Sequence, residues 1–546
     1  MEALASASSN FRDNIIAQYI YLCFAQLIEQ HNIPHLHEPV SQIRIFAIMR
    51  NTANTIFKNA SVLLISQLAT WGLTLALTVV LARYLGAELV GEYTIASSLW
   101  TIMGVIINFG MDTLLVKEIA RSPEKTPLLL SATLGARTIL FILSCGLIAV
   151  YIQIANFSST AIILVILLGI AQLITQLYLA IQASLQGLEL MHYVSIANVM
   201  SRIINTVLGI AVLVLGYGVY GIGFVTSIAM GVGLVLQYLF LRKKYPVHII
   251  FNAAELRRIL RTGLPYLASS LGLVAYGQVD VIVISSLINT TQVGWYGSAS
   301  RLFSTMMFFP VIFTTAIFPS LTRIYTHTPN SLPRIIQKSF NLMLVLSTPI
   351  GVCLLFIAKP LVVLLYGNDF SQSGPVLAIL GLVLIPTYQN ILLGQFLTST
   401  DRQNRWTVVM LLATAATLPL DLLLVPWCQA AFDNGAIAGA LSFLITEIGM
   451  VVIGITFLPN ESLNKNNIFT AIRICVAGGF MAYTMWLLAD FFMLIPALAG
   501  TIVYIGMILM IKAIPAEDLL LFKQFALSTL SRLHRNHNEP LSVEGA

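Results

Sequence analysis

The sequence has few charged residues and few cysteines. Asp, Glu, Lys and Arg make up 10% of its 546 residues, and hydrophobic residues make up 58%. A soluble protein carries about 25% charged and about 45–50% apolar residues, so this composition excludes an ordinary soluble domain. The 5 cysteines are scattered without a C-x-x-C pair, and the sequence therefore supports neither a disulfide framework nor a metal site.

Motifs for catalysis are also absent from the sequence. It contains no Walker loop, no G-x-S-x-G elbow and no H-E-x-x-H, and it has no extramembrane region long enough to fold around a sugar nucleotide. These absences favour a transporter over an enzyme. They predict no cofactor other than the Na⁺ or proton that could drive transport, and nothing indicates a nucleic-acid partner.

Long apolar runs are what the sequence does have. Between Lys58 and Ile511 we count fourteen runs of roughly membrane-spanning length, bounded by charge, Gly or Pro. A membrane β-barrel would instead show alternating segments of about ten residues. The sequence therefore predicts an all-α polytopic membrane protein with about fourteen transmembrane helices.

The loop charges predict how the chain is oriented. With the N-terminus inside, almost every basic loop falls on the same side, including the most basic connection, Arg242 to Thr262. Only Arg83 and Lys359 fall on the opposite side. Lys and Arg concentrate in cytoplasmic loops, so both termini are predicted to be cytoplasmic.

Six segments describe the predicted domain organisation. They are a cytoplasmic N-terminal extension (1–57), a first six-helix lobe (58–241), a basic cytoplasmic linker (242–262), a second six-helix lobe (263–458), a C-terminal helix pair (459–513) and a cytoplasmic tail (514–546).

The two lobes are predicted to be copies of one module. When Arg83 to Trp100 is laid over Ser286 to Phe303, Gly91 falls on Gly294 and Tyr93 falls on Tyr296. Internal repeats that straddle a site near the membrane midplane are typical of secondary transporters.

Three arginines inside predicted spans are candidate substrate ligands: Arg137, Arg202 and Arg301. A charge at the bilayer centre costs roughly 2.5–3.5 kcal/mol, so each guanidinium should face a cavity or a partner. One interpretation is a water-filled cationic cavity, because planar guanidinium groups hold phosphate oxygens in pairs. The alternative is a structural ion-pair network in which Asp280 and Glu447 neutralise the arginines.

Other polar residues in the spans suggest two further roles. Asp280 is a candidate for binding the Na⁺ or proton that couples transport to an ion gradient. Four amides of one predicted span could line a wet face for a glycan or bind helix to helix, namely Gln172, Gln176, Gln182 and Gln186.

Several segments resemble the polysaccharide-biosynthesis flippases. The resemblance lies in LARYLGAELVGEY at Leu81–Tyr93, DTLLVKEIAR at Asp112–Arg121, VGWYGSASRL at Val293–Leu302, AIFPSLTR at Ala316–Arg323 and LYGNDF at Leu365–Phe370. That family includes the O-antigen flippases and belongs to the multidrug/oligosaccharidyl-lipid/polysaccharide (MOP) exporter superfamily.

The resemblance implies a fold, a function and a location. The fold is two pseudo-symmetric six-helix lobes facing each other in a V, with additional C-terminal helices. The function is alternating-access flipping of a polyprenyl-pyrophosphate-linked oligosaccharide across the bacterial cytoplasmic (inner) membrane. Its partners are then the lipid-linked oligosaccharide, membrane lipid and polysaccharide-assembly proteins.

Two other functions stay open. A multidrug or metabolite cation antiporter of the same superfamily would favour acidic cavity residues, and the three buried arginines disfavour it. A membrane glycan polymerase or ligase usually has a large outer loop, whereas the outer loops predicted here are short.

Overall fold

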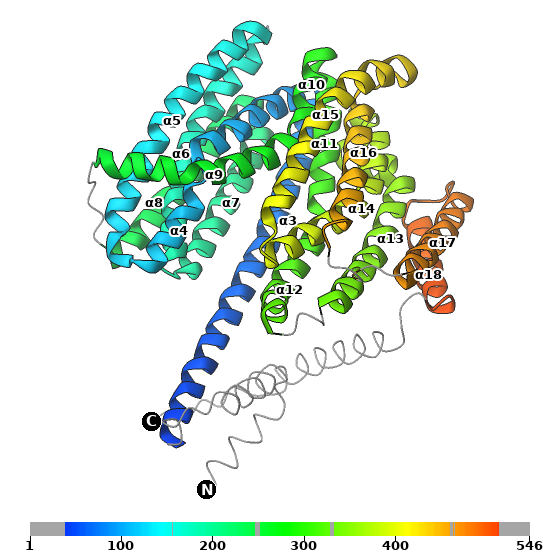
Figure 1. Ribbon diagram of the computed structural model, residues 1–546. Helices are drawn as coiled ribbons and strands as arrows, with labels where there is room; N and C mark the ends of the chain where they lie inside the picture. Colours follow the sequence, from blue (N-terminus) through cyan, green and yellow to red (C-terminus); the bar gives the residue numbers. More distant parts are fainter. Residues whose placement is uncertain are drawn as a thin grey trace, which may run out of the picture. The chain divides into compact units, whose positions relative to one another are not determined.

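A computed structural model describes residues 39–155, 157–245, 252–327, 332–458, 462 and 465–512. All regular elements in this described part are helices, which confirms the all-α prediction (Figure 1). Most of the predicted N-terminal extension, the predicted tail and residues 246–251 of the predicted linker lie outside it. The chain divides into two compact units, Met1–Gln67 and Leu68–Ala546, and all predicted site residues lie in the second.

The helices are long and follow one another with short connections. In chain order they are α3 (Pro39–Asn108), α4 (Met111–Arg121), η1 (Pro123–Lys125), α5 (Thr126–Ala155), α6 (Ser159–Gly187), α7 (Met191–Val214), α8 (Gly218–Lys244), α9 (Ala253–Tyr276), α10 (Val279–Leu287), α11 (Thr290–Thr305), α12 (Phe308–His327), α13 (Leu332–Tyr366), η3 (Asn368–Phe370), α14 (Ser373–Ser399), α15 (Gln403–Phe432), α16 (Ala436–Ile455), α17 (Lys465–Leu487) and α18 (Leu494–Met510).

Ten helices of the described residues are long and apolar enough to cross a membrane, or up to eleven if one bent pair counts as a span. The predicted number of fourteen is therefore not confirmed. Two predicted spans share the stretch Ala69–Arg121, another is divided between α11 and α12, and α18 has only 17 residues.

Breaks in the helices explain much of this difference. Gly86 interrupts α3 with φ 74°, and Phe109 and Gly110 separate α3 from α4 with φ 50° and 73°. Positive φ is easily adopted by glycine, so both breaks lie where the sequence provides one. A third break bends the chain by 44° between Ser270–Tyr276 and Val279–Leu287.

The two predicted repeats meet where α3 crosses α11. A Cβ on Gly91 would lie 1.8 Å from the Thr290 carbonyl oxygen, and a Cβ on Gly294 would lie 1.9 Å from that of Ala87. Both positions therefore require glycine, because the two backbones are in direct contact. The glycines that the sequence overlay pairs with each other are the contact points of this crossing.

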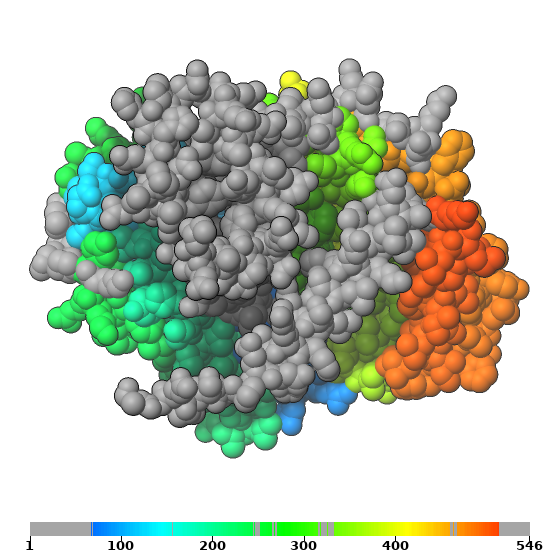
Figure 2. Space-filling model, turned by 90° about the horizontal axis from the view of Figure 1, so that it is seen from below, coloured from blue at the N-terminus to red at the C-terminus, as the bar shows by residue number. Residues whose placement is uncertain are grey.

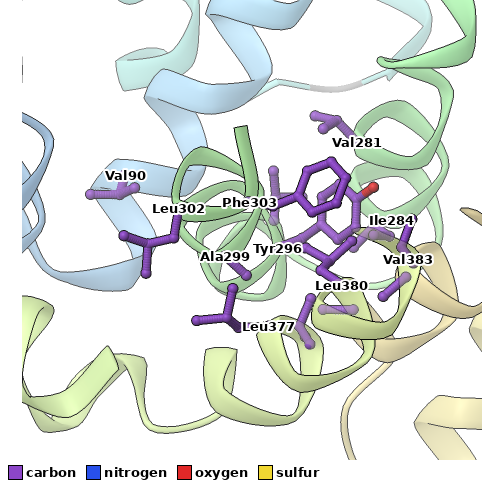
Figure 3. Packing of buried hydrophobic residues seen from close by; sticks show 14 of the residues in the cluster. Val90, Val281, Ile284, Tyr296, Ala299, Leu302, Phe303, Leu377, Leu380 and Val383 are labelled. Carbon is purple, nitrogen blue, oxygen red and sulfur yellow. The ribbon is translucent and has the colours of Figure 1, made fainter. Parts of the chain in front are cut away.

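Apolar side chains surround the crossing. Figure 3 shows Val90 of α3 and Leu302 of α11 in one buried cluster with Leu380 of α14, and Tyr296 lies in the same cluster. The cluster includes residues of both predicted lobes, so burial of apolar surface stabilises the contact between α3 and α11.

The last two helices pack on α13. Met481 and Met485 of α17 and Tyr504 of α18 form a buried cluster with Val352, and the Tyr504 hydroxyl donates to the Val345 carbonyl at 3.0 Å. Figures 1 and 2 show α17 and α18, coloured orange to red, at one edge of the helices.

Candidate substrate and ion sites

Two predicted arginines lie around one tyrosine. Arg301 of α11 is half-buried and lies over the ring of Tyr93, a residue of α3, with its Cζ 5.4 Å from the ring centroid. Arg202 of α7, also half-buried, interacts electrostatically with Tyr93 and with Tyr178 of α6. One arginine from each predicted lobe therefore interacts with Tyr93.

No carboxylate in the described part of the chain forms an ion pair with either of these arginines. The ion pairs found there join Arg137 to Asp112, and Arg258 to Glu118 and Glu255. An aromatic ring attracts a cation but does not neutralise its charge. Arg202 and Arg301 therefore retain positive charge that an anionic ligand can compensate.

Arg137 has a different environment. It is fully buried, and its Nη2 lies 2.5 Å from an Asp112 carboxylate oxygen. Its other terminal nitrogen donates to the Gln176 carbonyl oxygen, and Asn108 accepts a weaker hydrogen bond at 3.4 Å. Arg137 thereby ties α5 to α6 and to the break between α3 and α4. Its guanidinium is already paired, and its assignment as a substrate ligand stays a prediction.

The sequence reasoning did not identify Asp112 as a partner. It lies two residues after Gly110, and its carboxylate also accepts a 2.5 Å hydrogen bond from Asn108. The signal was present as an acidic residue in the first turn after a glycine break within an apolar stretch. The sequence could not show that Asp112 meets Arg137, because the contact depends on how the helices that carry them are rotated. The Asp112 side chain is 32% exposed in the structure.

The four glutamines of α6 do not share one environment. Gln176 is buried and donates to the Gly104 carbonyl at 3.1 Å, and Gln172 also packs against Gly104. Gln182 accepts from Gln237 of α8 at 3.5 Å, and Gln186 is half-buried. These contacts between helices account for at least two of the amides, while their role in lining a glycan path stays a prediction.

Asp280 lies in a buried acidic pair. It is 3% exposed, accepts a hydrogen bond from the Tyr296 hydroxyl, and interacts with Asp421 of α15. Asp421 is fully buried and also faces Ser442 of α16. Gly439 permits this approach, because a Cβ there would lie 2.8 Å from the Tyr296 ring.

The acidic pair has a chemical consequence. Two adjacent carboxylates repel each other strongly in a low dielectric, so the pair is stable only when it holds a proton or a cation. The sequence marked Asp421 as a charge inside a span but assigned it no role, since its partner lies 141 positions away in the chain.

The ion pairs that the sequence considered between Asp280 or Glu447 and Arg301 are not found among the described residues. Tyr296 and Arg301 are five residues apart on α11 and point in different directions, since five residues rotate the helix by about 140°. The Tyr296 side meets Asp280, and the Arg301 side meets Tyr93. Glu447 is bonded to Tyr276 and Asn390.

Known proteins resemble this chain in sequence and in fold. A family model described as "Polysaccharide biosynthesis protein" matches residues 56–325, and one described as "MatE" matches residues 265–423. The chain is 22% identical over 181 residues to "Probable low-salt glycan biosynthesis flippase Agl15" of Haloferax volcanii, covering 33% of this chain and 38% of that relative. The match therefore spans well under half of that relative.

Two solved structures share the fold. "Lipid II flippase MurJ, inward closed conformation" superposes with a TM-score of 0.67 at 15% identity, covering 84% of this chain and 99% of that one. An "inward-facing conformation of a multidrug resistance MATE family transporter of the MOP superfamily" superposes with a TM-score of 0.60 at 16% identity, covering 71% and 94%.

These likenesses define the class of protein. The chain has the helical fold of the MOP superfamily, and the relatives named above are described as flippases or transporters. The family-model match over residues 56–325 and the glycan-flippase relative support a place in the polysaccharide-biosynthesis flippase family of that superfamily.

Proposed function

We propose that this protein flips a polyprenyl-pyrophosphate-linked oligosaccharide from the cytoplasmic to the outer leaflet of a bacterial cytoplasmic membrane. The product would serve surface polysaccharide biosynthesis, with O-antigen as one example. Membrane lipid and polysaccharide-assembly proteins would be its partners, and both termini would be cytoplasmic. The glycan-flippase relative and the family match support this proposal.

The observation that carries the proposal is the pair of arginines around Tyr93. Arg202 and Arg301 are half-buried, come from different predicted lobes, and lack a carboxylate partner among the described residues. A pyrophosphate presents several anionic oxygens, and a guanidinium binds two of them at once. We propose Arg202 and Arg301 as its direct ligands, with Arg137 as a predicted third.

The proposed site avoids moving a bare charge through hydrocarbon. The cost of a charged group at the bilayer centre falls when fixed guanidinium groups replace its water. Because the two arginines come from different lobes, binding of one head group favours the conformation that brings them together. Opening on the other side would then separate them and release the lipid.

Ion coupling forms the second part of the proposal. Asp280, together with Asp421, would bind the Na⁺ or proton that drives the cycle. The buried, adjacent carboxyl groups support this role, because occupancy by a cation removes their mutual repulsion. The change in occupancy can therefore favour one packing of α10, α15 and α16 over another.

Flipping in proteoliposomes tests the proposal directly. The probe is a polyprenyl-pyrophosphate-linked oligosaccharide whose exposure in the outer leaflet is read by an added glycan-modifying enzyme. We expect Arg202→Ala and Arg301→Ala each to lower the flipping rate roughly 10- to 100-fold, since a charge-assisted hydrogen bond contributes about 1.5–3 kcal/mol. Arg137→Ala in the same assay tests the third predicted ligand.

The matched control is Arg257→Ala, which removes an exposed arginine on α9 and should leave flipping unchanged. Asp280→Asn should strongly weaken the dependence of flipping on the ion gradient. Wild-type rates in both the Arg202 and Arg301 variants, at equal amounts of folded protein, would exclude the anion site. Export of cationic dyes without lipid flipping would instead favour the antiporter.

A further inference from the structure

Glu447 is a buried carboxyl group that the proposed cycle does not use. It lies on α16, is 4% exposed, and no Lys or Arg of the described residues forms an ion pair with it. One carboxyl oxygen accepts from the Tyr276 hydroxyl at 3.1 Å, and the other accepts from the Asn390 amide nitrogen at 2.8 Å. The three residues that these hydrogen bonds join lie on three helices, α9, α14 and α16.

The orientation of Asn390 distinguishes a proton from a metal cation. Its amide nitrogen donates both to the Glu447 carboxyl group and, at 2.8 Å, to the Glu447 main-chain oxygen. Its amide oxygen is buried and has no hydrogen-bond partner in the described part of the chain. A Na⁺ ion needs several oxygen atoms directed toward it, whereas here N–H and O–H groups point at the carboxyl group. The donor set therefore suits a carboxyl group that exchanges a proton.

When Glu447 gains that proton, the hydrogen bonds around Tyr276 can reverse their direction. Thr446 donates to the Ser442 carbonyl at 2.9 Å, which leaves its oxygen free to accept from the Tyr276 hydroxyl, 2.8 Å away. When Glu447 is ionised, Tyr276 donates to it. When Glu447 gains one proton, its O–H donates to Tyr276, and Tyr276 donates to Thr446. Both states satisfy the Glu447, Tyr276 and Thr446 side chains with the heavy atoms in place, and only one proton enters or leaves.

The other groups that face Glu447 are neutral or acidic. From α14 come Asn390 and Thr387, and from α9 comes Tyr276, whose ring makes an edge contact with Phe443 at 5.4 Å. Asp280 is the next acidic group beyond Tyr276 and interacts with that hydroxyl electrostatically. Negative charge on Glu447 and on Asp280 therefore acts on the same tyrosine.

We infer that Glu447, held by Tyr276 and Asn390, is a second proton-binding site of this transporter, distinct from the Asp280–Asp421 pair and linked to it through Tyr276. Its use in transport rests on the proposed function, but its protonation does not. A carboxyl group without a cationic partner costs several kcal/mol to keep charged in a membrane helix. A site that holds a proton in one conformation and releases it in another would add to the coupling that Asp280 provides.

Infrared difference spectroscopy on the full-length protein in lipid nanodiscs tests the inference. The signal is the carbonyl stretch of a protonated carboxyl group, recorded as the pH is changed in H₂O and in D₂O. We expect Glu447→Gln to lose one pH-dependent band that Asp280→Asn and Asp421→Asn retain. Tyr276→Phe keeps the ring and removes the hydroxyl, so it should shift the frequency of that band without removing it.

Three results would overturn the inference. They are an unchanged spectrum in Glu447→Gln, a Glu447 band that does not change at any pH at which the protein stays folded, and loss of the band when Na⁺ is added at fixed pH. The spectrum does not require flipping, so a protein that moves no lipid-linked oligosaccharide would still give an answer. If flipping is observed, Glu447→Gln should weaken its dependence on the proton gradient, with folding checked by thermal unfolding.

Discussion

Arg137 and Arg301 differ in whether a carboxylate neutralises their charge. Arg137 has no exposed surface and is paired with Asp112, whereas Arg301 contacts the ring of Tyr93 and has no acidic partner in the described helices. A paired buried charge contributes to the fold, and an unpaired one at a half-buried position is available to a ligand. The same residue type therefore supports two different predictions.

Replacing Arg137 should destabilise the fold. Arg137→Ala removes the donor of one Asp112 carboxylate oxygen and of the Gln176 carbonyl, and removing one partner of a buried pair costs about 3 kcal/mol. We expect a clearly lower midpoint of thermal unfolding in detergent. Arg258→Ala is the matched control. The Arg258 side chain is exposed, so its ion pair with Glu255 should contribute less than about 1 kcal/mol. Equal stability of the two variants would show that the Arg137 pair is not structural.

The sequence marked the charged residues inside the spans but not their partners. Asp280 and Arg301 were identified because a charge stands out in an apolar run. Their contacts depend on which side of α11 each one meets, and this rotation is set by packing against α3, α14 and α16. An ion pair between the two residues was therefore a reasonable hypothesis that the tertiary structure did not bear out.

At the scale of helices, the contact between α3 and α11 depends on two glycines. The carbonyl oxygens of Thr290 and Ala87 occupy the positions where side chains on Gly91 and Gly294 would lie. Backbone atoms cannot move aside as a flexible side chain can. Any substitution at either glycine must therefore separate the two helices.

Gly294→Ala should lower stability by about 1–3 kcal/mol, the usual cost of overpacking. The matched control is Gly449→Ala on α16, where an added Cβ would meet nothing within 4 Å. We expect that variant to be unchanged or slightly more stable, because Ala is a better helix former than Gly by up to about 1 kcal/mol. Thermal unfolding of both purified variants measures the difference, and similar losses in the two would contradict the close crossing.

At the scale of the whole second unit, the predicted lobes are also joined near the predicted outer face. The Arg83 Nε donates to the Leu365 carbonyl at 2.7 Å, and its Nη2 donates to the Leu364 carbonyl. These oxygens lie at the C-terminal end of α13, where unpaired carbonyls favour a cation. If transport proceeds by alternating access, this contact must open in each cycle.

Tethering the contact should stop transport. In a cysteine-free background, Arg83→Cys and Leu364→Cys are joined by a cleavable thiol reagent about as long as an arginine side chain. We expect flipping to fall to background and to recover when the tether is cleaved, because the two lobes can no longer separate. The control joins Trp295→Cys to Asp369→Cys, which lie in the same lobe, where Trp295 donates to the Asp369 carbonyl at 3.0 Å. Full activity of the tethered Arg83 pair would exclude opening at this contact.

The sequence by itself determined the local properties of the protein. Apolar run length predicts membrane helices because backbone groups in lipid must be satisfied within the helix, and glycines at 86 and 110 lie where helices break. Tertiary structure alone decided the pairings, such as Asp280 with Asp421, Arg137 with Asp112, and Arg301 with Tyr93. These depend on helix rotation and depth, which result from the packing of many side chains distant in the sequence.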